Sequence, residues 1–139
     1  MRKQFFILLM VILSLVVLSL AACGGGQTAG GPTEVHVKMD EFKFEMDKTS
    51  IPVGPVKFII ENAGKEKHEA VVELAGDDDK PLEANGKEAE AADIEAGKSA
   101  TLEWTFDKPG KYQLGCHIKD NNEDHYALGM VTPFEVTAK

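Results

Sequence analysis

Four side chains that can bind a soft metal ion occur in this sequence, three of them near its C-terminal end. Cys116 is followed nine positions later by His125 and five positions after that by Met130, while His68 lies earlier in the chain. Thiolate and thioether sulfur favour Cu(I), and imidazole nitrogen accepts Cu(II), so this mixture suits an ion that changes its charge. The sequence therefore predicts one mononuclear copper site per chain, with the methionine as a long, weak axial ligand.

Each of these residue types also has an ordinary structural role. Cys116 alone could be a small buried apolar side chain, and His68 alone could be structural. The other two histidines, His36 and His117, are expected at the surface. The acidic stretch 120–124 lacks the alternating oxygens and central glycine of an EF-hand loop, so it is expected to be a solvated loop. The joint occurrence of four ligand types in this order is what favours a metal.

The segment that carries the cysteine has the alternation of a β-strand. Tyr112, Leu114 and Cys116 fall on one face at period two, so Cys116 is expected to point into the core and His117 away from it. The chain then becomes polar until His125. One loop between two strands is therefore predicted to begin with the thiol and to end with an imidazole and a thioether.

Period-two alternation recurs along residues 33–139, and turn residues separate the short strands. Seven or eight strands in a domain of about 100 residues predict an all-β fold, namely a Greek-key antiparallel β-sandwich. Residues 76–97 break the pattern and are expected to form a surface excursion. Its Ala- and Glu-rich part, residues 82–92, could hold one short helix.

Two segments resemble a known family. Residues 62–68 match the cupredoxin pattern N-x-G-x-x-x-H, and a tyrosine strand with Cys116, His125 and Met130 resembles the second half of that pattern, which ends in H-x-x-x-x-M. The resemblance to these blue-copper proteins, such as plastocyanin and azurin, covers nearly all of residues 33–139. It implies a cupredoxin-like fold and one type 1 copper held by the four candidate ligands. It also implies that electrons enter and leave through His125.

The sequence departs from the family pattern at two places. Eight residues separate Cys116 from His125, where many cupredoxins have a shorter connection, and this length resembles the type 1 site of copper nitrite reductases. Glu69 follows the first histidine, where an asparagine often bonds across to the cysteine loop. Hydrogen bonds around a metal site tune its properties, so these departures bear on the potential, rigidity and exposure of the site.

The first residues predict export and lipidation. Arg2 and Lys3 precede an apolar run that is short for a membrane span, and the run ends in Leu-Ala-Ala-Cys, which resembles the bacterial lipobox. A plain secretory signal or an uncleaved N-terminal anchor are the alternatives. The expected organisation is a lipoprotein signal peptide at 1–22, a lipidated Cys23, a Gly-rich tether at 23–32 and a copper-binding domain at 33–139. The expected location is the outer face of the cytoplasmic membrane or the periplasm.

The charge of the mature chain limits its partners. Cleavage removes Arg2 and Lys3, which lowers the basic residues from 15 to 13 against 23 acidic ones and leaves a net charge of −10. Such a surface repels nucleic acid and anionic lipid. It favours a redox partner with a basic docking surface, such as a cytochrome or a respiratory complex.

We therefore expect a membrane-anchored electron carrier and not an enzyme. One alternative is a copper chaperone or storage protein that delivers copper to an oxidase, although the sequence has no Met- and His-rich tail. Another is a reductase with a second copper at His117 or His36, although the sequence has one domain and no His-x-His pair. The single cysteine left after lipidation excludes a binuclear electron-transfer copper site.

Overall fold

A computed structural model describes residues 30–139 of the chain. The expected signal peptide 1–22, Cys23 and most of the expected tether lie outside the described residues. Residues Gly31–Lys139 form a unit of their own. Within the described part of the chain, no helix is long and apolar enough to cross a membrane.

The first sheet has four strands with one apolar face. Its order is β2-β1-β4-β9, with β1 (Thr33–Asp40), β2 (Lys43–Met46), β4 (Gly54–Asn62) and β9 (Ser99–Phe106). In β1 the side chains of Val35, Val37 and Met39 are buried and those between them are exposed, as expected of a strand with one wet face. β1 pairs with β4 in parallel, and the other pairs in this sheet are antiparallel.

The second sheet has five strands in the order β3-β13-β10-β5-β8. These are β3 (Ser50–Pro52), β5 (His68–Leu74), β8 (Glu90–Ile94), β10 (Gly110–Gly115) and β13 (Val131–Thr137). β13 pairs with β3 in parallel, and its other neighbour is antiparallel. In β5 both faces are buried between Ala70 and Glu73, and the segment after this strand folds back to pair with the backbone of Val72.

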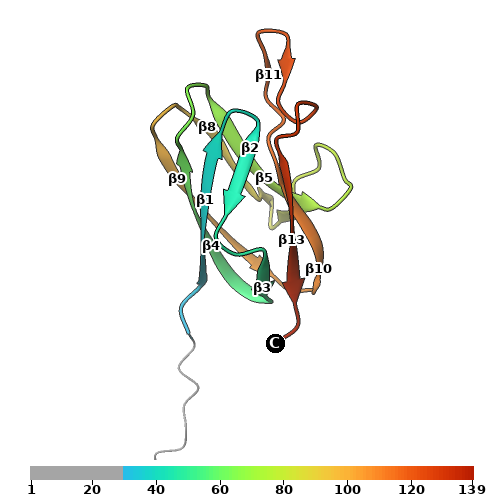
Figure 1. Ribbon diagram of the computed structural model, residues 1–139. Helices are drawn as coiled ribbons and strands as arrows, with labels where there is room; N and C mark the ends of the chain where they lie inside the picture. Colours follow the sequence, from blue (N-terminus) through green and yellow to red (C-terminus); the bar gives the residue numbers. More distant parts are fainter. Residues whose placement is uncertain (1–29) are drawn as a thin grey trace, which may run out of the picture. The chain divides into compact units, whose positions relative to one another are not determined.

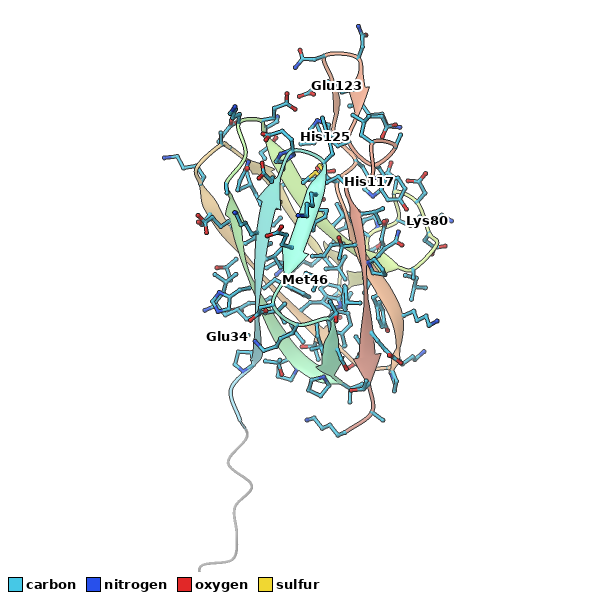
Figure 2. The ribbon with its side chains drawn as sticks, viewed as in Figure 1. Glu34, Met46, Lys80, His117, Glu123 and His125 are labelled. Atoms are coloured by element: carbon cyan, nitrogen blue, oxygen red, sulfur yellow. The ribbon has the colours of Figure 1, made fainter. Side chains whose placement is uncertain are left out.

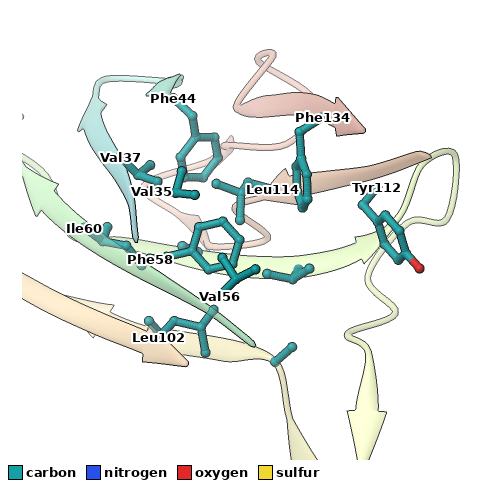
Figure 3. Close-up of a cluster of buried hydrophobic side chains, with 14 of the residues drawn as sticks. Val35, Val37, Phe44, Val56, Phe58, Ile60, Leu102, Tyr112, Leu114 and Phe134 are labelled. Carbon is teal, nitrogen blue, oxygen red and sulfur yellow. The ribbon is translucent and has the colours of Figure 1, made fainter. Parts of the chain in front are cut away.

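An aromatic cluster joins the two sheets (Figure 3). Phe58 from the first sheet lies edge-on to Phe134 from the second, with ring centroids 6.0 Å apart, and Phe106 packs against Tyr112 at 4.9 Å. The Phe58 side chain is fully buried, so its truncation to alanine is worth about 3–5 kcal/mol of the free energy of unfolding. This core holds the two sheets in a fixed position beneath the candidate ligands.

The predicted all-β sandwich is confirmed, with three corrections. The two main sheets hold nine strands and not seven or eight. Two of the strand pairs are parallel, so the sandwich is not purely antiparallel. The excursion 76–97 contains no helix in the structure and is built from strands and turns.

The chain after β5 forms a hairpin, because an Asn-Gly pair places a turn within a segment whose composition favours a helix. β6 (Glu83–Ala84) and β7 (Lys87–Glu88) flank Asn85 and Gly86, which have φ values of 55° and 71°. Positive φ at both central residues is the conformation of a tight hairpin turn. Ala89, fully buried, then accepts a hydrogen bond from the Val72 amide at 2.8 Å, so pairing with β5 overrides helix propensity.

The candidate ligands lie at one end of the domain. Figure 1 shows the hairpin of β11 (Lys119–Asp120) and β12 (Glu123–Asp124) projecting from this end, near the turn that joins β1 to β2. Glu34, at the start of β1, lies at the opposite end from His125 (Figure 2). The eight residues of β1 account for this separation, since a strand of that length spans roughly 25 Å.

Candidate metal centre

Three of the four predicted ligands converge in the interior. His68 begins β5, Cys116 follows the end of β10, and His125 ends the loop that contains the β11–β12 hairpin. His68 Nδ1 lies 3.2 Å from His125 Nδ1, which lies 3.5 Å from Cys116 Sγ, and all three residues are fully buried. Metal–donor bonds of about 2.0–2.3 Å place donor atoms roughly 3.3–3.7 Å apart, so these donors fit a single type 1 copper ion.

Backbone hydrogen bonds place Met130 beside two of these ligands. The Met130 amide donates to the carbonyl of His125 at 2.9 Å, and its carbonyl accepts from the Cys116 amide at 3.1 Å. The Met130 side chain is fully buried. Its role as the axial ligand stays a prediction that this placement supports.

Without a metal, the centre favours neutral ligands. Burial raises the pKa of the Cys116 thiol to about 11, against a partial opposing effect of hydrogen bonds from the Glu69 and Ile118 amides. Burial, followed by the neighbouring His125, lowers the pKa of His68. A bound cation reverses the first effect, because metal coordination requires the thiolate and releases its proton.

The loop before His68 is held by the asparagine of the N-x-G pattern. The buried Asn62 amide donates to the carbonyls of Glu66 and Ile94 at 2.8 Å each, and its oxygen accepts from the Gly64 amide at 3.0 Å. A Cβ at Gly64 would lie 2.6 Å from Glu41 Oε1, so the close approach of that carboxylate requires glycine. The asparagine and the glycine of this pattern therefore fix the backbone just before His68, which is the first residue of β5.

His117 is not at the surface, which corrects the sequence prediction. Its side chain is only 7% exposed, and its Nε2 lies 3.3 Å from Oε2 of the fully buried Glu73. The ring also stacks on Tyr126, with centroids 4.7 Å apart. The strand rule was right that His117 points away from Cys116, but the side to which it points is covered by other parts of the chain.

A buried polar network surrounds Glu73 on that side. Gln113 donates to Glu73 Oε1 at 2.8 Å and to the Tyr126 hydroxyl at 2.9 Å, and the Lys80 amide donates to Glu73 Oε2 at 3.2 Å. A Cβ at Gly115 would lie 2.8 Å from Glu73 Oε1, so glycine lets the network pack against the backbone just before the cysteine. These contacts join the cysteine loop to β5 and β10.

Glu69 bonds across to the cysteine loop although it is not the asparagine often found there. Its Oε1 accepts from the His117 amide at 2.8 Å. A carboxylate can accept this bond as an amide oxygen does, so the second departure from the family pattern keeps the contact. A carboxyl group in place of the amide is the difference that remains beside the cysteine loop.

The outer edge of His125 faces two carboxylates that the sequence analysis did not connect with it. His125 Nε2 lies 3.4 Å from Asp120 Oδ1 and 3.6 Å from Glu66 Oε2, and Phe42 packs edge-on to the ring at 5.1 Å. Asp120 belongs to β11, so the expected solvated loop is an ordered hairpin. Asn121 and Asn122 form its turn with φ of 46° and 65°.

His36 is the one histidine of the chain outside this region. It lies on the exposed face of β1, as the sequence predicted, and its amide donates to Asp47 Oδ1 at 2.7 Å. It therefore has no part in the cluster.

Comparison with known proteins identifies related domains. The family model described as a cupredoxin-like domain matches residues 7–125. None of the curated proteins matches the chain by sequence.

Solved structures of similar fold include two auracyanins and a multicopper oxidase. The sodium-dithionite-reduced auracyanin of Roseiflexus castenholzii is 21% identical over 78% of this chain and 99% of that one, with a TM-score of 0.57. Auracyanin A of Chloroflexus aurantiacus, named a "blue" copper protein, is 18% identical over 78% of this chain and 100% of that one, with a TM-score of 0.54. A multicopper oxidase is 19% identical over 78% of this chain and 39% of its own, with a TM-score of 0.50. Identities of this size show a shared fold.

Proposed function

This chain belongs to the cupredoxin-like family, and we propose that it carries single electrons through one type 1 copper ion held by His68, Cys116, His125 and Met130. The observation that carries this proposal is the convergence of three buried donor atoms, two imidazole nitrogens and one thiol sulfur, on a single point. The auracyanin similar in fold and named a "blue" copper protein supports the same cofactor.

The bound copper ion would take up and release one electron, and the protein's part is to keep the ligands still while it does so. His68 is anchored at the start of β5, and Cys116 is anchored through its amide to Met130. Ligands held by strands move little when the charge of the ion changes. The buried network around Glu73 adds a second support on the far side of the cysteine.

Full burial of the donors supports carriage of electrons over delivery of copper. A protein that passes Cu(I) to a partner has to expose its ligands to exchange them, whereas His68, Cys116 and His125 have no exposed surface. A second catalytic copper also lacks support: among the described residues, neither His117 nor His36 belongs to a cluster of metal-binding atoms.

We place electron exchange at the His125 end of the domain. Asp120 and Glu66 lie at this end and are both partly exposed, with 39% and 35% of their side-chain surface accessible. With the net negative charge of the chain, these carboxylates would attract a basic redox partner and give fast, salt-sensitive encounters. A cytochrome or a respiratory complex fits this description.

We propose an anchored carrier whose described domain begins at the end opposite the candidate copper ligands. β1 begins at the end of the domain opposite His125 (Figure 2). In this proposal Cys23 carries the lipid, residues 23–32 are the tether, and the domain lies on the outer face of the cytoplasmic membrane or in the periplasm. Electron exchange with a soluble or membrane-bound partner would take place at the His125 end.

The test is the absorption and paramagnetic resonance of residues 31–139 with one equivalent of copper. Thiolate-to-copper charge transfer should turn the oxidised protein blue. Cys116→Ser should fold and stay colourless, which serves as the control. A wild-type protein that binds Cu(II) without colour contradicts the electron-carrier proposal.

A further inference from the structure

The outer nitrogen of His125 and two carboxylates form a second cluster of metal-binding atoms. His125 Nε2, Asp120 Oδ1 and Glu66 Oε2 all lie within 4.8 Å of one another, and the three atoms are buried. None of them has a hydrogen-bond partner among the described residues. This cluster lies on the opposite edge of the imidazole from the copper ligands, since His125 Nδ1 faces His68 and Cys116.

The distances fit coordination better than hydrogen bonding. Nε2 is 3.4 Å from one carboxylate oxygen and 3.6 Å from the other, whereas an N–H···O bond has a length of about 2.7–3.2 Å. Zinc bonds of about 2.0–2.2 Å in tetrahedral geometry place the donors roughly 3.3–3.6 Å apart. All three atoms lack a hydrogen-bond partner among the described residues, and a divalent cation between them would be a partner shared by all three.

We propose that Glu66, Asp120 and His125 Nε2 form a second metal site that takes a divalent cation of the zinc type. Three protein ligands leave a fourth position for water. The site goes beyond electron carriage, although it shares His125 with the copper centre. When copper occupies Nδ1, the proton on Nε2 passes to solvent as the second cation binds, and the imidazole becomes a bridge between the two ions.

Both carboxylates reach the surface, which gives the cation a path of entry. Glu66 is held by the Asn62 loop, and Asp120 belongs to β11, so two separate elements close around His125. Binding of the cation would cross-link these elements. The cation would also bring two positive charges to the place where the Nε2 proton had brought one. The added positive charge beside the copper ion raises the reduction potential of the copper.

The experiment titrates zinc into the mature chain loaded with Cu(II). Calorimetry measures the binding, and elemental analysis after dialysis gives the amount of zinc that stays bound. We expect one zinc per copper, unchanged blue absorption and a higher copper potential. Glu66→Gln and Asp120→Asn should each weaken zinc binding by at least about tenfold, and the double variant should abolish it. Glu123→Gln, on the same hairpin but outside the cluster, is the matched control and should bind zinc as the wild type does.

Three results would overturn the second site: no zinc beyond the copper, equal zinc binding in the double variant, or displacement of copper with loss of colour. The second site is also refuted if Glu66→Gln raises the copper potential while the wild type takes up no zinc. The carboxylates would then act only as acceptors of the Nε2 proton. The blue absorption recorded before zinc is added tests the copper proposal separately. If that colour is absent, the same variants titrated in a Cys116→Ser background still decide whether zinc depends on the two carboxylates.

Discussion

The buried pair of Glu73 and His117 should stabilise the domain strongly without touching the copper ion. The Glu73 carboxylate is fully buried and accepts hydrogen bonds from Gln113 and the Lys80 amide, while His117 Nε2 lies 3.3 Å away. A buried polar group that loses its hydrogen-bond partner costs about 1–3 kcal/mol. Truncation of Glu73 removes the acceptor of both the Gln113 and the Lys80 amide and also leaves a cavity, so the two costs add.

We therefore expect Glu73→Ala to lower the free energy of unfolding of the copper-free domain by about 3–5 kcal/mol. For a domain of about 100 residues this lowers Tm by more than about 10 °C. The assay is urea unfolding followed by circular dichroism and calorimetry. Glu103→Ala, on the exposed face of β9, is the control and should change the free energy by less than about 0.5 kcal/mol.

A double-mutant cycle isolates the interaction between the two side chains. His117→Phe keeps a ring to stack on Tyr126 and removes both nitrogens, and Glu73→Gln keeps the volume and one acceptor oxygen. We expect a coupling energy of at least about 1 kcal/mol between the two substitutions. Both variants should bind copper and stay blue, because His117 points away from the copper ligands. A coupling energy near zero, or a stability loss no larger than that of Glu103→Ala, would refute this account of the network.

Four further outcomes are expected. Met130→Leu should keep the blue colour and raise the potential measured by voltammetry, because a weak donor that helps Cu(II) is removed; a lower potential contradicts an axial role. His125→Ala should bleach or green the site while His117→Ala leaves it blue, and the reverse pattern in absorption spectra contradicts the ligand assignment. Burial lowers the pKa of His68 in the copper-free domain. Below about pH 6.5 the unfolded chain therefore binds a proton that the folded chain does not. The free energy of unfolding should then fall as the pH falls from 7 to 5. Urea midpoints check this, with a smaller dependence expected for His68→Gln. Cys23→Ser should release the chain from membranes or leave it uncleaved, and a lipid-free wild type in the soluble fraction contradicts lipidation.

The alternation of the strands was enough to predict much of the fold and the inward direction of Cys116. Val35, Val37 and Met39 show the clean period of a strand with one wet face, and Cys116 follows the inward face of β10 as expected. The N-x-G pattern also predicted the position of His68, because Asn62 acts within six residues of it. Local patterns of this kind are visible in a sequence because the residues involved are close along the chain.

Contacts between distant segments are what the sequence did not show. His117 has the outward direction that its strand implies, yet Glu73, which precedes it by more than 40 residues, covers it. Asp120 meets His125 only because its hairpin folds back over the ring. The Ala- and Glu-rich excursion has helical composition, but Asn85 and Gly86 favour a turn, and β5 offers its edge for pairing.

The order of the strands explains why a loop as long as that between Cys116 and His125 need not weaken the site. The start of β5, the end of β10 and the start of β13 lie at the same end of the sheet. Gly115, the last residue of β10, pairs with Val71 on one side and with Val131 on the other. Three of the proposed ligands, His68, Cys116 and Met130, are thus placed by neighbouring central strands. The fourth, His125, is tied at both ends of its own backbone: its amide donates to the Ile118 carbonyl at 3.1 Å, and its carbonyl accepts from Met130 at 2.9 Å. The residues in between fold on themselves as β11 and β12, so the added length lies outside the metal centre and changes what covers His125, not how firmly it is held.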